Sequence, residues 1–208
     1  MLTALTGSGG CTACRCREKG RGGALTRVAR ARCRQRARDR CGPCDFVFDA
    51  CANGQQLKCL TVVDEFTREC LAIDVAGSIR SGRVIEVLSR LVSIHGSPRH
   101  LRSDNGPEFV SRAILKWLTW ANIDTAHIEP GKPWQNGNNE SFNGKFRDEC
   151  LSMEWFKNRI DAKIVIEDFR RQFNEVRPHS SLGQLTPAEF KRQLGMVPQW
   201  AMSSKGPE

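Results

Sequence analysis

Two short stretches decide the fold of this chain, SDNGPEF at residues 103–109 and QNGNNESFN at residues 135–143. In the first, the turn-forming sequence Asn-Gly-Pro directly follows Asp104, so this acid is expected to be the last residue before a bend. In the second, Gly and Asn give way to a helical pattern, which places Glu140 in the first turn of a helix. The two acids are separated by 35 residues, 105–139.

A third acid, Asp45, opens a β-prone run at residues 45–49 of the kind that a buried strand shows. Two further β-prone runs follow at residues 57–64 and 70–75, with turn signals at residues 53–54 and 65–68. Three carboxylates from two strands and one helix can converge on a metal site. Mg²⁺ is a hard cation that carboxylates and phosphate oxygens hold, and a pair of such ions clamps the attacking and leaving oxygens of a phosphoryl displacement.

In combination, several motifs resemble the transposases of bacterial insertion sequences whose catalytic core is of the retroviral-integrase type. These motifs are DFV at 45–47, VVDEFTRE at 62–69, SDNG at 103–106, the helix that carries Glu140, and RPHSSLG at 177–183 followed by TPAEF at 186–190. The resemblance covers roughly residues 45–192. It implies an α/β fold with a ribonuclease-H-like, mixed five-stranded sheet flanked by helices.

By this resemblance the catalytic and metal-binding acids are Asp45, Asp104 and Glu140, in an Asp-Asp-(35)-Glu arrangement. The resemblance implies a polynucleotidyl transferase that uses two Mg²⁺ ions, for which Mn²⁺ can substitute. It also implies two kinds of partner: DNA, as element ends and target, and further copies of the chain assembled on that DNA. It favours Asp45 over two other acids, Asp49 and Asp64. These two are each expected to be a solvated acid at a strand end.

Two other functions remain open. A ribonuclease-H-like nuclease would only hydrolyse nucleic acid, whereas a transferase would also let a DNA 3′-hydroxyl replace water. A DNA-binding remnant without activity would do neither, and a failure to bind Mg²⁺ through the acids would identify it.

The helix that carries Glu140 is expected to have two faces. At 100° per residue, Glu140, Asn143 and Arg147 share one face, and Phe142 and Phe146 point to the opposite side, which is expected to dock on the sheet. Arg147 lies two turns after Glu140, where a guanidinium can bind a phosphate bidentately. The alternative is an exposed charge without a partner.

Further side chains are candidates for contact with DNA. They are Asn143 and Lys145 on the Glu140 helix, and Lys132, which lies near Trp134 in a loop rich in Gly, Pro and Asn. An ordinary surface loop is the alternative there. Trp117 and Trp120 could stack on bases, although core packing is expected for Trp117. His179 is expected to have a structural or phosphate-contacting role rather than to be a catalytic base.

Residues 1–44 differ in composition from the rest. They carry eleven basic and two acidic side chains, a net charge of +9, so the other 164 residues are neutral overall. A basic, disordered arm that contacts DNA is the expected reading. A zinc site at Cys11-x-x-Cys14 and Cys41-x-x-Cys44 is one alternative. Translation out of frame is another, because Gly42-Pro43-Cys44 replaces the Trp-Ser-Met-like tripeptide of the family.

The expected organisation is therefore a basic segment at residues 1–44, a catalytic core with C-terminal helices at 45–194, and a flexible tail at 195–208. No apolar run is long enough for a membrane span and no secretory signal is evident, so a bacterial cytoplasmic location without a membrane partner is expected. The cysteines of the core are expected to be small buried hydrophobes; they are Cys51, Cys59, Cys70 and Cys150.

The remaining pattern predicts four more helices and two short strands. A core-facing helix at residues 81–95 has Ser81 as its expected N-cap, and the last helix is opened by Thr186 as N-cap with Pro187 at its first position. The other helices are expected at residues 113–121 and 161–174, and the strands at 99–103 and 123–128.

Overall fold

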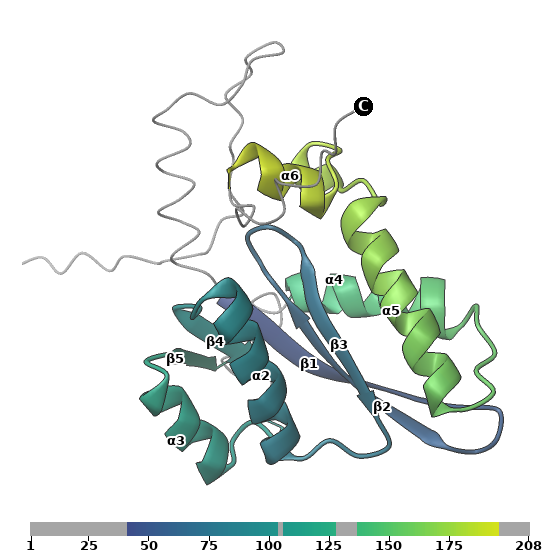
Figure 1. Ribbon diagram of the computed structural model, residues 1–208, viewed down its shortest axis with the longest axis horizontal. Coiled ribbons are helices and arrows are strands. Elements are labelled where there is room, and N and C mark those ends of the chain that lie inside the picture. Colours follow the sequence, from purple (N-terminus) through teal and green to yellow (C-terminus); the bar gives the residue numbers. More distant parts are fainter. Residues whose placement is uncertain (1–40, 104–105, 128–136, 196–208) are drawn as a thin grey trace, which may run out of the picture.

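The computed structural model describes residues 41–103, 106–127 and 137–195 (Figure 1). Its strands are β1 (Cys41–Ala50), β2 (Gln56–Val63), β3 (Cys70–Ala76), β4 (His100–Ser103) and β5 (Asp124–His127). They form one sheet in the order β3-β2-β1-β4-β5. The strands β1, β2 and β3 are antiparallel, whereas β4 runs parallel to β1 and β5 runs parallel to β4. This confirms the predicted mixed five-stranded sheet.

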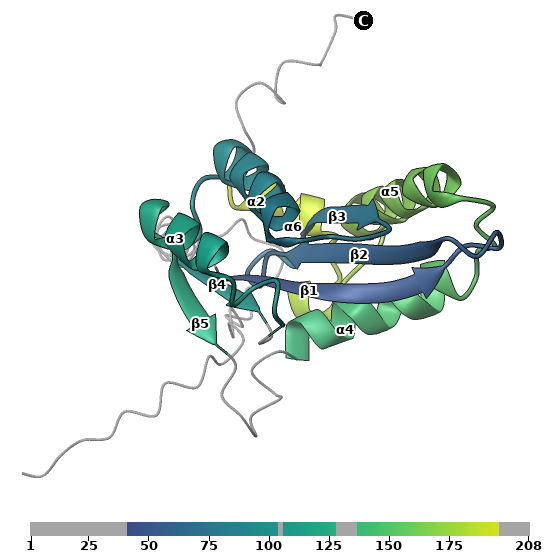
Figure 2. The ribbon, with the colours of Figure 1, turned by 90° about the horizontal axis from the view of Figure 1, so that it is seen from below.

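Helices cover both faces of the sheet. They are α2 (Ser81–His95), α3 (Arg112–Trp120), α4 (Gly137–Phe146) with the π-helical turn η2 (Arg147–Leu151), α5 (Arg159–Glu175), the 3₁₀ turn η3 (Ser180–Leu182) and α6 (Pro187–Gln193). Figure 2 shows α4 along one side of β1, with α2 and α3 on the other side. In the described part of the chain, no helix is long and apolar enough to span a membrane.

Two hydrophobic cores result, one on each face, because successive strand residues point to opposite sides of a sheet. The first core joins Leu60 of β2 to Val84 of α2 and Ile114 of α3. The second joins Val47 of β1 to Phe146 of α4 and Ile166 of α5. Full burial of each such side chain stabilises the fold by about 1.5–3 kcal/mol. The sheet is thus fixed from both sides.

The four core cysteines are buried free thiols, as predicted. Burial raises the pKa of both Cys59 and Cys150 to about 12, and neighbouring acids add to the shift. Each is therefore a neutral thiol at physiological pH, and packing is the role that the structure supports.

Strand β1 begins at Cys41, four residues before the boundary expected at Asp45. Its first residues pair in parallel with β4, from Cys41 opposite His100 to Cys44 opposite Ser103. Cys44 is buried in the first core, where its thiol donates to the carbonyl of Arg102 at 3.5 Å. Residues 41–44 thus belong to the sheet. The expectations for residues 1–40 and for the tail from 196 onward concern parts outside the described residues.

The N-cap predicted from the sequence is right for one helix and wrong for another. Thr186 caps α6, with Pro187 as its first residue, and the Thr186 N–H donates to the Glu189 carboxylate at 2.9 Å, which completes a capping box. The bounds predicted for α2 are also right. Its N-cap, however, is Arg80 and not Ser81, and no side chain caps that helix.

Candidate active site

Asp45 lies within β1 with its side chain on the α4 side of the sheet. Its neighbours in the strand, Cys44 and Phe46, pack into the first core, so the alternation of the strand directs Asp45 to the opposite face. Its Oδ1 accepts a hydrogen bond from the Phe46 backbone N–H at 2.8 Å, and its Oδ2 accepts one from Nδ2 of Asn143 at 2.8 Å. The carboxylate is therefore held against α4.

Asn143 connects this carboxylate to the neighbouring strand. Its side chain is only 3% exposed, and its Oδ1 accepts a hydrogen bond from Oγ1 of the fully buried Thr61 at 3.1 Å. Both ends of the amide are thus engaged, one by Asp45 and the other by Thr61. The sequence suggested Asn143 as a DNA contact, but the structure places it beneath the site, where it orients Asp45.

Glu140 lies in the first turn of α4, as predicted, and is exposed. It precedes Asn143 by three residues, and residues at this spacing on a helix have Cβ atoms about 5–6 Å apart. Because Asn143 contacts Asp45 directly, Glu140 lies about one helical turn from the Asp45 carboxylate along α4. The structure therefore places two of the three predicted acids at α4, with Glu140 in its first turn and Asp45 bonded to it one turn later.

Asp104, the third predicted acid, lies outside the described residues. Ser103, directly before it, is the last residue of β4 and pairs with Cys44, directly before Asp45. Adjacent strands lie about 4.8 Å apart. Strand β4 therefore ends beside Cys44, the residue directly before Asp45. Within the ranges that the structure describes, no three His, Cys, Asp or Glu side chains form a metal-binding group.

The segment that follows Asp104 is fastened to the sheet. Lys58 of β2 forms an ion pair with Glu108 at 2.5 Å, and this bond lowers the pKa of Glu108. The Lys58 ammonium also lies 4.0 Å from the centre of the Phe46 ring, and Phe109 stacks on that ring with centroids 5.0 Å apart. The position of this segment is therefore set by contacts with β1 and β2.

Asp64 and Asp49, the two acids considered as alternatives to Asp45, lie in other environments. Asp64 was expected to be solvated, and this is wrong: it is 2% exposed, and its Oδ1 accepts hydrogen bonds from the N–H groups of Phe66 at 2.8 Å and Thr67 at 3.3 Å. It thereby holds the turn between β2 and β3. Asp49 is half-buried in β1, opposite Leu57 of β2.

The side of α4 that docks on the sheet is the predicted one, because Phe142 and Phe146 are buried in the second core. Arg147 is exposed at the start of η2, and Lys145 is half-buried. Lys132 lies outside the described residues.

Sequence reasoning did not foresee that Asn139 would also be buried. Its side chain is fully buried next to Glu140, and neither amide atom has a hydrogen-bond partner among the residues that the structure describes. The role of Thr61 was likewise not foreseen. The only signal in the sequence was a hydroxyl between two apolar residues, Leu60 and Val62.

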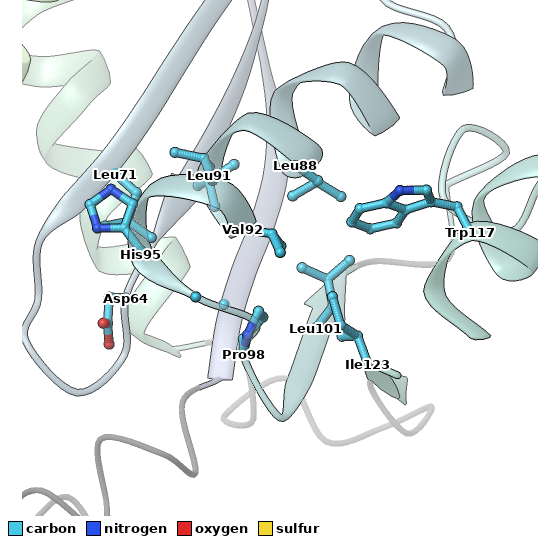
Figure 3. Close-up of a pocket in the computed structure, with 13 residues that line it drawn as sticks. Asp64, Leu71, Leu88, Leu91, Val92, His95, Pro98, Leu101, Trp117 and Ile123 are labelled. Atoms are coloured by element: carbon cyan, nitrogen blue, oxygen red, sulfur yellow. The ribbon is translucent and has the colours of Figure 1, made fainter. Parts of the chain in front are cut away.

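A cavity of about 40 Å³ lies on the other face of the sheet (Figure 3). Leu88, Leu91 and Trp117 line it, with Asp64 and His95 toward one end. Trp117 packs against the first core, as expected, whereas Trp120 is 83% exposed. The cavity is separated by the sheet from the side on which Asp45 meets α4, and so it is not part of the candidate site.

Two family models, each described as integrase core domain, match the chain at residues 37–133 and 121–187. An uncharacterized 39.2 kDa protein of insertion element IS476 from Xanthomonas euvesicatoria is 52% identical over 70% of this chain and 42% of its own length. An uncharacterized 31.7 kDa protein of insertion element IS407 from Burkholderia multivorans is 48% identical over 70% of this chain and 53% of its own length. The chain thus spans about half the length of these relatives.

Solved structures with the same fold are cores of retroviral integrases. The catalytic core domain of HTLV-2 integrase, in complex with magnesium, superposes with a TM-score of 0.56 at 17% identity, over 73% of this chain and 95% of that one. The catalytic core domain of BIV integrase superposes with a TM-score of 0.54 at 17% identity, over 71% of this chain and 91% of that one. These cores have a ribonuclease-H-like fold, which confirms the predicted fold class.

Proposed function

Because this chain belongs to the integrase-core family of insertion-sequence transposases, we propose that it is a polynucleotidyl transferase that cuts the ends of a DNA element and joins them to target DNA. The observation that carries the proposal is the fixed position of the Asp45 carboxylate, held against the helix that presents Glu140. Asp104 would complete the triad from the neighbouring strand β4. The bacterial sources of the relatives favour action in the cytoplasm of a bacterium.

The described donors fit magnesium. Asp45 and Glu140 offer carboxylate oxygens, the ligands that this hard cation prefers, and hydrogen bonds from Phe46 and Asn143 hold the Asp45 carboxylate in place. We infer that Asp45, Asp104 and Glu140 hold two Mg²⁺ ions, which Mn²⁺ can replace. When bound, such a pair of ions supplies stabilisation of the attacking and leaving oxygens in the displacement.

The protein contributes preorganisation. Asn143 fixes one oxygen of Asp45, and Thr61 fixes Asn143. Because both supporting side chains are buried, the carboxylate does not have to be ordered when substrate arrives, and a site held in this way loses less free energy at the reacting step. The second core under α4 fixes the helix axis and with it the direction of Glu140.

Contacts with DNA are proposed for the exposed side of α4 and the loop before it. Arg147 follows Glu140 by two turns, so its guanidinium can bind a backbone phosphate next to the reacting one. Lys132 in the preceding loop and Lys145 on the other flank of α4 would add further contacts. We also propose that copies of the chain assemble on the DNA, because a transposition reaction must act on two element ends together.

The test uses pre-cut element ends supplied as oligonucleotides with Mg²⁺. We expect Glu140→Gln and Asp104→Asn to remove strand transfer by at least about 10³-fold while thermal unfolding is unchanged. Asp148→Asn is the control, because Asp148 is an exposed acid two turns further along the same helical segment. Full activity in either of the first two variants would overturn the assignment. Hydrolysis without transfer in the unmutated protein would favour the nuclease alternative.

A further inference from the structure

An ion pair lies on the same face of the sheet as Asp45. Nη1 of Arg102 in β4 donates a hydrogen bond to Oε1 of Glu65, which belongs to the turn between β2 and β3. Both side chains are largely buried, with 18% of Arg102 and 10% of Glu65 exposed. Leu101, directly before Arg102, packs into the first core, so the alternation of β4 directs Arg102 to the opposite face, where α4 lies.

The register of the sheet brings this pair close to Asp45. Arg102 lies opposite Pro43 where β4 runs parallel to β1, and Asp45 follows Pro43 by two residues. Adjacent strands are about 4.8 Å apart, and each residue advances about 3.3 Å along a strand. The Cα atoms of Arg102 and Asp45 are therefore about 8 Å apart, and the two side chains share a face. The charge of Arg102 is thus within electrostatic range of a cation that Asp45 holds.

The turn between β2 and β3 holds Glu65 in place. The buried carboxylate of Asp64, directly before it, accepts hydrogen bonds from the N–H groups of Phe66 and Thr67, directly after it. These bonds close the turn around Glu65. The acid is therefore presented to Arg102 by a hydrogen-bonded turn, and its carboxylate does not have to be ordered when the ion pair forms.

Stability alone does not explain an ion pair at this place. Two charges lose their hydration when they are buried, and their mutual attraction often does no more than offset that loss. Apolar side chains of similar size would therefore hold β4 to the turn equally well. An arginine also keeps its charge in proteins, because its guanidinium is not deprotonated. Arg102 thus places a permanent positive charge near a carboxylate that is proposed to hold cations.

The charge of Glu65 offsets that of Arg102. An uncompensated positive charge near Asp45 would repel a divalent cation and would attract the carboxylate oxygens that the cation needs. The Glu65 carboxylate is bonded to the guanidinium, so the ion pair as a whole is neutral. The metal-binding acids then keep their attraction for cations, while the ion pair still fixes β4 beside β1.

We propose that Glu65 is a positioning residue for the metal site, where it acts through Arg102 and sets the affinity of the Asp45 site for divalent cations. This inference rests on the proposed function in that Asp45 is a metal ligand there. One unit charge about 10 Å from a divalent ion, with screening close to that of water, changes the affinity for the ion about fivefold. Loss of the Glu65 charge should weaken cation binding by this factor, and loss of the Arg102 charge should strengthen it.

The test measures Mn²⁺ binding to the whole chain without DNA, from the electron paramagnetic resonance signal of the free ion. Glu65→Gln should raise the dissociation constant about fivefold, and Arg102→Met should lower it. The double variant, which lacks both charges, should return to the value of the unmutated protein. A purely structural role predicts another pattern, in which both single variants weaken binding and the double variant binds no more tightly than either.

The double variant also guards against misfolding. If circular dichroism shows that Glu65→Gln alone does not fold, the double variant is compared with Arg102→Met, because these two differ only in the charge of residue 65. Binding should then be about fivefold weaker in the double variant. Equal binding by the two would overturn the inference.

The matched control is Glu69→Gln, at the other end of the same turn. Glu69 forms an ion pair of similar burial with Lys191 of α6 at 2.8 Å, and Figure 1 shows α6 beside this turn. The strand register places the Cα atom of Glu69 about 16 Å from that of Asp45, about twice as far as Arg102. Glu69→Gln should therefore leave Mn²⁺ binding unchanged within about twofold. Equal effects of Glu65→Gln and Glu69→Gln, or no effect of either, would overturn the inference.

A further variant, Asp45→Asn, separates this inference from the proposed function. If the unmutated protein does not bind Mn²⁺, or if Asp45→Asn binds it equally well, the proposed metal site fails and the inference fails with it. If binding is lost in Asp45→Asn but is unchanged in Glu65→Gln, the inference alone is overturned and the proposed function stands.

Discussion

Replacement of Asn143 by alanine distinguishes two roles for this side chain, orientation of Asp45 and direct contact with DNA. The structure supports the first, because the amide is buried and bonded at both ends. Asn143→Ala removes the bond to the Asp45 carboxylate, and a hydrogen bond to a charged group contributes about 1.5–3 kcal/mol. It also removes the bond from Thr61, a neutral one of about 1 kcal/mol.

The expected loss in free energy of unfolding is therefore about 2.5–4 kcal/mol. The Thr61 hydroxyl keeps its contact with the Asp45 carbonyl at 3.3 Å, which favours the lower part of this range. Urea unfolding followed by circular dichroism measures the loss. Asn158→Ala is a suitable control, because it removes the N-cap of α5, worth about 1 kcal/mol, and leaves Asp45 untouched.

Activity separates the two roles further. If Asn143 orients Asp45, Asn143→Ala should lower strand transfer by about 10²-fold at a temperature where the variant is folded, and duplex binding in EDTA should be unchanged. The Asn158→Ala control should retain transfer. The reasoning is refuted if Asn143→Ala costs under 1 kcal/mol and weakens duplex binding, since that pattern is expected of an exposed DNA contact.

Two further predictions concern the surroundings of the site. Lys58→Met leaves Glu108 without its cation and loosens the segment after Asp104, so strand transfer should fall about tenfold or more while the far-ultraviolet circular dichroism spectrum is retained. The pKa of His179 is lowered from its ordinary value of 6.5, so the folded state resists protonation and stability should fall as the pH drops below about 6.5. His179→Gln should flatten this fall in pH-dependent urea unfolding and His100→Gln should not.

The sheet could be predicted because its signals are local. The turn at Asn53-Gly54 lies between two β-prone runs, and the structure pairs those runs as the hairpin of β1 and β2, with Gly54 at a φ of 78°. The start of β1 could not be placed in the same way. Residues 41–44 have little β-propensity, and they join the strand because β4, more than 50 residues later, provides a parallel partner.

The face of α4 illustrates a different limit. Helical periodicity correctly placed Phe142 and Phe146 toward the sheet. It assigned Asn143 to the solvent side, because a polar side chain is counted as exposed. The partner that keeps Asn143 inside is Asp45, 98 residues earlier, and only the fold brings the two together. Asn139 is buried on the same face, and helical periodicity does not predict its burial either.

The same contact links folding to chemistry. A carboxylate that is to hold cations must keep its oxygens accessible, yet Asp45 is half-buried in a central strand, where a charged group without a hydrogen-bond donor is costly. A lysine or arginine in place of Asn143 would satisfy the charge, but it would also compete with the cations for the same oxygens. The neutral amide donates one hydrogen bond and adds no charge. It can therefore orient Asp45 and leave the attraction for metal intact, which is why Asn143→Lys should abolish strand transfer even where it preserves the fold.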